Sequence, residues 1–225
     1  MTTRRAQGAD YERIAVQTHL IHIKEPLDPV FDEYVKPVLQ PGDWLAVSEK
    51  FVTISQGRVI HHSVVRPGVL AKLLVKGVTK HPDDVGYSDP KKMQVAIMQA
   101  GWWRMVLALI IGTFTRFVLR RRGDFYRVAG HRISEIDGFS PATVKPFDEF
   151  AMLGPADPDA AAAEISAHLG GVPVAIVDAN NINVEVLGTS AGFPADRAVV
   201  REVLLDNPLG QNDELTPIIV IRRLP

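Results

Sequence analysis

Residues 172–180 read VPVAIVDAN, and this stretch decides the kind of sheet that the chain can form. Apart from Pro173, the run up to Val177 is continuously apolar and rich in β-branched residues. A short run that does not alternate with polar residues predicts a strand that is buried on both faces. Asp178 follows directly, so the sequence places a carboxylate where a buried strand ends.

Further strands are predicted on both sides of this one, at residues 14–23, 44–48, 59–61, 125–128, 150–153, 184–187 and 218–221. Residues 51–53 are expected to extend the second of these strands. Helical spacing and capping residues predict helices at residues 29–38, 68–75, 90–100, 157–168 and 194–205. The elements mix without a strict βαβ rhythm, which predicts an α+β fold with a mixed sheet.

The composition excludes several classes of protein. The 225 residues hold 25 Lys and Arg against 26 Asp and Glu, so no overall positive field draws the protein to nucleic acid. The chain has no cysteine, which excludes disulfides, thiolate zinc sites, iron–sulfur clusters and a cysteine nucleophile. The missing cysteine also fits a cytoplasmic protein. Residues 1–12 are expected to form a flexible tail ahead of one domain over residues 13–225.

Residues 102–122 combine a dense apolar run with flanking Trp and Arg, from Trp102 to Arg122. Thr113, Thr115 and Arg116 interrupt the run, which is shorter than the roughly 20 residues that a membrane span needs. We therefore expect a buried helix with a basic C-terminal end, and no membrane association. A helix that docks on a membrane surface or a partner is the alternative.

Three groups of polar residues are candidates for chemistry. Asp178 can hold a divalent metal with help from Asn180 or Asn181, although Asp and Asn also favour plain turns. Lys50 and Arg58 flank hydroxyl groups and a glycine, a combination that can seat a phosphate or lie in a solvated hairpin.

The third group is acidic. Glu135 and Asp137 form a carboxylate pair that can hold a metal bridging phosphate oxygens, and His131 is the histidine nearest to them. None of the seven histidines, including His61 and His62, has a metal-binding spacing such as HExxH. No catalytic residue is predicted.

Several motifs resemble the coenzyme F(420)-0:gamma-glutamyl ligase family. The stretch GDWLAVSEK at residues 42–50, followed by QGRVI at 56–60, resembles the opening motif of that family. VAIVD at 174–178 is similar to its second motif, a strand that ends in a metal-binding Asp-Thr. TPIIVIR at 216–222 resembles its closing strand, and residues 87–148 match worst.

The resemblance implies an α+β fold of one domain, an intertwined homodimer, and small-molecule substrates. It implies a ligase that uses GTP and Mg²⁺ or Mn²⁺ to add L-glutamate, through a gamma-glutamyl amide bond, to an F(420)-0-like acceptor by way of an acyl phosphate. Asp178 then matches a family metal ligand, and Asp137 takes a second metal position. Glu49 and Lys50 fall where the family contacts the nucleotide, and Arg58 is expected to contact phosphate.

The chain departs from the family pattern at polar positions. Ile54 replaces a usual lysine, Gln56 replaces a glutamate, and Ala179 stands in place of a threonine ligand. The helical segment at about residues 88–122 is divergent. A catalytically degraded member that binds nucleotide or an F(420)-like ligand without turnover is therefore an alternative, beside the docking module at residues 102–122.

Overall fold

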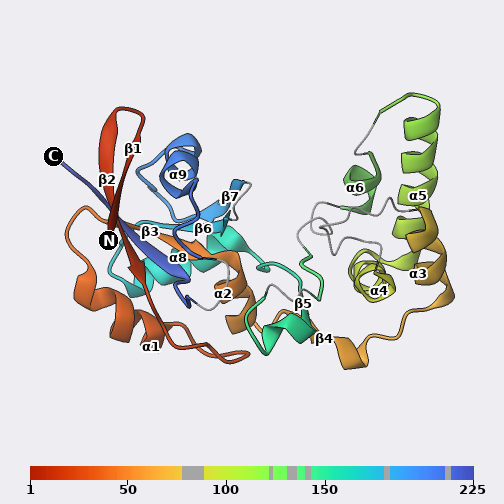
Figure 1. Cartoon of the computed structure of the whole chain (residues 1–225), viewed down its shortest axis with the longest axis horizontal. Helices are drawn as coiled ribbons and strands as arrows, with labels where there is room; N and C mark the ends of the chain where they lie inside the picture. Colours follow the sequence, from red (N-terminus) through yellow and green to blue (C-terminus); the bar gives the residue numbers. More distant parts are fainter. Residues whose placement is uncertain (78–88, 122–123, 131–135, 140–142, 180–182, 211–213) are drawn as a thin grey trace. The chain divides into compact units, whose positions relative to one another are not determined.

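The computed structural model describes residues 1–77, 89–121, 124–130, 136–139, 143–179, 183–210 and 214–225. This part of the chain packs into two compact units. Unit 1 consists of Met1–Arg58 and Pro155–Pro225, and unit 2 consists of Val59–Gly154. The predicted α+β class is confirmed, because a mixed sheet packs with helices in the first unit (Figure 1).

Within the described residues of unit 1, six strands form one sheet in the order β1-β2-β8-β3-β6-β7. Their bounds are Thr2–Ala6 for β1, Ala9–Val16 for β2, Trp44–Ser48 for β3, Val174–Ala179 for β6, Val184–Thr189 for β7 and Ile218–Arg223 for β8. β3 and β6 run parallel, whereas the other neighbouring strands run antiparallel. The motifs at residues 42–50, 174–178 and 216–222 thus supply the middle of the sheet.

Helices cover both faces of this sheet. One face is covered by α9, Arg197–Leu204, and the other by α2, Glu49–Ser55, and α8, Pro158–His168. The remaining helical segments of unit 1 follow one another between β2 and β3, namely α1 at Asp28–Val30, the π-helix η1 at Phe31–Val35 and the 3₁₀-helix η2 at Lys36–Val38. The sheet is therefore buried on both sides, as the unalternating run at residues 172–177 predicts.

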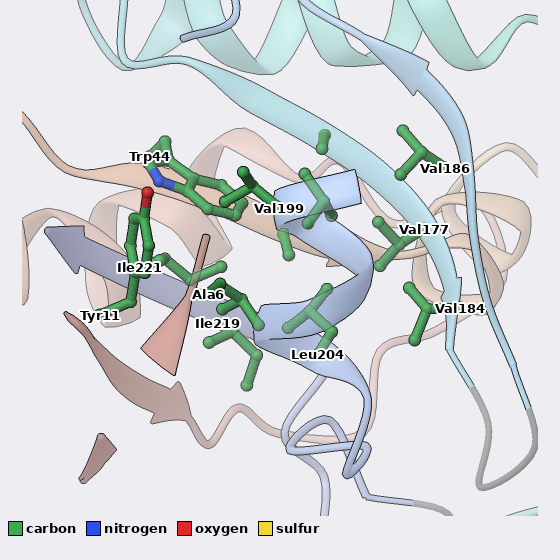
Figure 2. Packing of buried hydrophobic residues seen from close by; sticks show 14 of the residues in the cluster. Ala6, Tyr11, Trp44, Val177, Val184, Val186, Val199, Leu204, Ile219 and Ile221 are labelled. Atoms are coloured by element: carbon green, nitrogen blue, oxygen red, sulfur yellow. The ribbon is translucent and has the colours of Figure 1, made fainter. Parts of the chain in front are cut away.

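The hydrophobic core beneath α9 joins every strand of the sheet (Figure 2). Trp44, Val177 and Ile219 supply it from β3, β6 and β8. Phe193 packs edge-on against Trp44, with ring centroids 5.2 Å apart. Because β6 and β8 each present buried residues to α9, this helix fixes the sheet on the side opposite to α2 and α8.

Residues 1–12 differ from the expected tail, because they form β1 and the start of β2. Gln7 and Gly8 both have positive φ, at 44° and 83°, as a two-residue hairpin turn requires. Ala6 and Tyr11 are buried in the core beneath α9. Few residues of this hairpin face the core, so its sequence is mostly polar and does not predict strands.

An ion pair between Asp43 and Arg222 ties the start of β3 to the end of β8. Nε and Nη2 of Arg222 donate to the two carboxylate oxygens of Asp43, each at 2.9 Å. Nη1 of Arg222 also donates to Glu12 at 3.0 Å. The side chain of Asp43 is fully buried, and its hydrogen bonds raise the pKa of Arg222 above its ordinary value. A charge buried in this way is tolerated only with its partner.

We therefore predict that Arg222→Met lowers the free energy of unfolding by about 3–5 kcal/mol, because it leaves the buried carboxylate of Asp43 without its cation. Urea unfolding followed by circular dichroism measures the loss. Arg223→Met is the matched control, since Arg223 is exposed at the next position, and it should change stability little. Equal effects of the two substitutions would contradict the structural role of the pair.

Unit 2 contains a small sheet and a group of helices. In its described residues β4, Val59–His61, pairs antiparallel with β5, Phe150–Met152. The helical segments of this unit are η3 at His62–Val64, α3 at Val69–Leu74, η4 at Val75–Gly77, α4 at Pro90–Ala100, α5 at Trp102–Phe117, α6 at Asp124–Ala129 and η5 at Phe147–Glu149. Residues 125–128, expected as a strand, are helical in α6.

Helix α5 differs from the buried helix that the sequence predicts. Met105, Ala108 and Thr115 are buried, and Gly112 lies so close to Phe125 of α6 that a β-carbon would sit 2.8 Å from its side chain. The opposite side of α5 is exposed and apolar. The packed face of α5 thus combines Met105 with small residues, while several large apolar side chains face outward.

No single helix in the described residues is long and apolar enough to cross a membrane. The pair of α4 and α5 passes the same length and composition test together, but the two helices are bent by 109° at their junction.

Candidate functional site

The parallel pairing of β3 with β6 brings two of the predicted polar groups to one edge of the sheet. Ser48, the last residue of β3, lies opposite Val177 of β6. Glu49 and Lys50 therefore leave β3 beside the position where Asp178 follows Val177. Carboxyl ends of neighbouring parallel strands are where polar groups can gather over a rigid base.

The chain turns into helix α2 at this edge. Ser48 is the residue before the helix, and Glu49–Ser55 are helical. The expectation that residues 51–53 extend β3 is wrong, because these residues form a helix whose consecutive positions Phe51, Val52, Thr53 and Ile54 are all buried. Glu49 and Lys50 consequently occupy the first turn of α2, with Glu49 buried and Lys50 half-buried.

A carboxylate that the sequence analysis did not single out lies opposite Asp178. In the antiparallel pair β6–β7, Asp178 is the register partner of Glu185. Residues in such positions have side chains on the same face, with β-carbons about 5 Å apart. Glu185 is exposed between the buried residues Val184 and Val186. The alternation of apolar and polar residues in β7 was therefore the signal in the sequence that could have identified Glu185. The edge thus carries two acidic groups on one face.

Ala179 lies on the other face of β6 from Asp178. Its side chain packs against the core beneath α9, and its register partner is the buried Val184. The replacement of a family threonine at this position therefore changes the core side of the strand. The face that bears Asp178 and Glu185 keeps its carboxylates.

The departures at Ile54 and Gln56 have structural roles here. Ile54 is 5% exposed, so the position of the usual lysine is part of the hydrophobic interior. Gln56 ends α2, and its Oε1 accepts a hydrogen bond from the backbone N–H of Ala156 at 2.8 Å. Neither residue supplies a charged group in this structure.

Arg58 lies beyond the end of α2, which is about 10 Å long at the usual rise per residue and has Glu49 in its first turn. Gly57 before it has a φ of 66°, and the stem of the exposed Lys24 lies where a β-carbon of residue 57 would be, at 2.6 Å. Lys24 is therefore a second cation beside the Gly57–Arg58 backbone. The sequence gives no sign of this neighbour, because Lys24 and Gly57 are distant in the chain.

Asp137 belongs to unit 2, whereas Asp178 belongs to unit 1. The backbone of Asp137 forms a bridge with Met152, with hydrogen bonds of 3.0 and 2.8 Å in the two directions. Next to it, Gly138 leaves room for the stem of the buried Lys92 of α4, which would lie 2.5 Å from a β-carbon there. The predicted candidates Glu135, Asn180, Asn181 and His131 lie outside the described residues.

The donor set at the edge of the sheet suits a hard cation and a phosphate. Carboxylate oxygens such as those of Asp178 and Glu185 are the ligands that Mg²⁺ and Mn²⁺ prefer. Lys50 supplies a positive charge at the same edge. This chemistry fits a metal-bound nucleotide, and the residues present fit the metal that the motif resemblance implies.

The fold is thus that of an α+β protein in which carboxylates and a lysine lie where two parallel strands of a mixed sheet end. The model of the F420-0:gamma-glutamyl ligase family matches residues 15–187, about three quarters of the chain. The chain belongs to this family, the gamma-glutamyl ligases of F420 biosynthesis, whose substrates are small molecules. No curated protein matches the chain.

Glu185 provides a direct test of the acidic edge. Without metal, Glu185→Gln should raise the free energy of unfolding by about 0.2–1 kcal/mol, because it removes a like charge opposite Asp178. With Mn²⁺ the same substitution should reduce the stabilisation that the ion gives. Urea unfolding in a chelator and in Mn²⁺ measures both effects.

Glu164→Gln is the control for this substitution, since Glu164 is exposed on α8. It should leave both measurements unchanged. A loss of stability in Glu185→Gln without metal, together with an unchanged response to Mn²⁺, would show that Glu185 has no part in a cation site.

Proposed function

We propose that the protein is a GTP- and divalent-metal-dependent ligase that joins L-glutamate to an F420-0-like acceptor, in a gamma-glutamyl amide linkage, by way of an acyl phosphate. The observation that carries the proposal is the common sheet edge of Glu49, Lys50 and Asp178. Family membership supplies the ligase class, and this edge supplies groups of the right charge for the nucleotide.

The chemistry explains why such a site needs both charges. The carboxylate of the acceptor is a poor acyl donor. One of its oxygens therefore first attacks the γ-phosphorus of GTP, and GDP leaves. The amine of glutamate then attacks the acyl carbon, and phosphate leaves with the electron pair of the broken C–O bond. A bound Mg²⁺ or Mn²⁺ neutralises charge on the triphosphate and on the transferred group.

The residues of the chain take the following proposed roles. Asp178 holds the metal, with Glu185 on the same strand face as a further carboxylate. Lys50 and Arg58 contact phosphate oxygens, and Glu49 contacts the nucleotide. Asp137 in unit 2 stays a predicted metal ligand from the motif resemblance, and homodimerisation stays a prediction of the same origin.

We predict that GTP with Mn²⁺ raises the melting temperature of the protein and that Asp178→Asn removes this shift. The same substitution should lower the rate of glutamate addition by about 100-fold or more, since several kcal/mol of charge stabilisation are lost. Thermal unfolding and chromatography of the F420 products are the measurements. Asp10→Asn, an exposed carboxylate of β2, is the control.

The outcomes separate the ligase from a degraded relative. The buried Ile54 in place of a lysine favours the degraded relative, because a cation is missing from α2. A melting shift without product would establish binding without turnover. No shift at millimolar GTP and Mn²⁺ would contradict both.

A second candidate function rests on the exposed side of α5. This apolar α5 face consists of Trp102, Trp103, Leu107, Ile110 and Phe114, of which Trp102 is 67% and Ile110 60% exposed. Soluble helices place such residues inward, and an exposed patch of this kind marks an interaction surface.

Charge favours an anionic lipid surface as the occupant of the apolar α5 face. Residues 90–122 hold no Asp or Glu but include Arg104, Arg116 and Arg120. In a symmetric contact with a second copy, these cations would meet the same cations. Anionic headgroups complement them, and the Trp and Phe side chains suit the boundary of the acyl chains. A helix of 16 residues is about 24 Å long, which suits lying on a membrane better than crossing it.

We predict that the protein co-sediments with vesicles containing phosphatidylglycerol more strongly than with phosphatidylcholine vesicles. Ile110→Glu and Phe114→Glu should each weaken this binding at least about tenfold, because a charged side chain is costly to place among acyl chains. Leu205→Glu, at an exposed leucine after α9, is the matched control. Dimers that Ile110→Glu dissociates, with no vesicle binding, would assign the face to a second copy instead.

A further inference from the structure

His61, His62 and Glu149 come together in unit 2, outside the residues proposed for the ligase reaction. His61 is the last residue of β4, His62 begins η3, and Glu149 ends η5 directly before β5. Each residue offers one ligand atom, and these atoms lie within 4.8 Å of one another. The antiparallel register pairs His61 with Phe150, the neighbour of Glu149.

Ring contacts hold both imidazoles, and His61 also has hydrogen-bond partners. The ring of His61 lies 4.5 Å from that of His62 and 4.9 Å from that of Phe150, measured between centroids. His62 packs edge-on against Phe139 at 6.4 Å. Aromatic contacts of this kind orient the ligand rings and reduce the ordering cost of binding an ion.

His61 has partners on both ring nitrogens. Nε2 lies 3.0 Å from Oε2 of Glu149, and Nδ1 lies 2.7 Å from Oγ of Ser63. Nδ1 also accepts a hydrogen bond from the backbone N–H of Ser63 at 3.2 Å, so the neutral ring carries its hydrogen on Nε2. Metal binding at Nε2 moves that hydrogen to Nδ1, which then gives up the bond from the backbone N–H and donates to the hydroxyl of Ser63. Metal-bound histidines usually have such a partner on the second nitrogen.

We propose that His61, His62 and Glu149 bind one divalent cation of the zinc class. Two imidazole nitrogens and one carboxylate oxygen favour Zn²⁺, Ni²⁺ or Co²⁺ over Mg²⁺. Zinc ligands lie about 2.0–2.1 Å from the ion, so their atoms stand about 3.4 Å apart in a tetrahedral site. The three ligand atoms lie within 4.8 Å of one another, and the exposed side chain of Glu149 can move to reach the spacing of a zinc site.

The place of the cluster in the chain gives the ion a structural role. β4 begins unit 2 at Val59 and β5 lies just before its end at Gly154. A two-stranded sheet is only marginally stable by itself. An ion that joins His61 and His62 to Glu149 closes a long loop and holds both ends of unit 2 together. Three protein ligands also leave a fourth position for water or a substrate group.

Isothermal titration of the full chain with Zn²⁺ tests the proposal, with Co²⁺ absorption as the report on coordination geometry. We expect one equivalent of Zn²⁺ to bind the wild type and to raise its melting temperature. His62→Ala and Glu149→Gln should each weaken binding at least about tenfold and remove the thermal shift. Glu149 is 56% exposed, so this second variant is expected to fold.

Two further variants make the test specific. His22→Ala removes an exposed histidine of unit 1 and should leave the isotherm unchanged. Asp178→Asn should also keep Zn²⁺ binding, which separates this site from the proposed nucleotide metal. The proposal would be overturned by no binding in the wild type, or by equal Zn²⁺ affinity in His62→Ala, Glu149→Gln and His22→Ala.

Discussion

The parallel pairing of β3 with β6 is the constraint on which the candidate site depends. The other neighbouring strands described in the sheet run antiparallel. The carboxyl ends of two antiparallel neighbours therefore point in opposite directions and do not lie side by side. The parallel pair instead sends Glu49 and Lys50 out of one strand beside Asp178 at the end of the other. The helices on both faces hold that register, because a slip of one residue would turn Val177 away from the core and Asp178 into it.

Residues of the sequence motifs divide into those that build the sheet and those that face the site. Asp43 and Arg222 belong to the first group, since their buried ion pair joins β3 to β8. Asp178, near the end of β6, and Lys50, just after β3, are the motif residues proposed for the second. Ile54 stands at a motif position where the family usually has a lysine. Its side chain is part of the hydrophobic interior, so this position helps to build the fold.

Strong apolar runs made most strands predictable, and local ambiguity caused the errors. The strands predicted at residues 44–48, 184–187 and 218–221 are present, and the one predicted at 172–177 is present as Val174–Ala179, because their runs leave no alternative way to bury so much apolar surface. Phe51 and Val52 fit a strand or a helix equally well, and so do Phe125 and Val128. In each case packing decided for a helix: the first pair is buried within α2, and the second belongs to the core of unit 2 together with residues of α5.

The sequence alone determined the class of the fold, the central strands and the chemistry available to the protein, because these follow from local apolar patterns and from the residue types present. It identified Asp178 and Lys50 by their places at strand ends. Only the tertiary structure decided that Glu185 lies opposite Asp178 and that Glu149 meets His61 across 88 positions of the chain. Such pairs depend on strand register and chain crossing, which are set by the burial of the whole sheet and leave no regular spacing in the sequence.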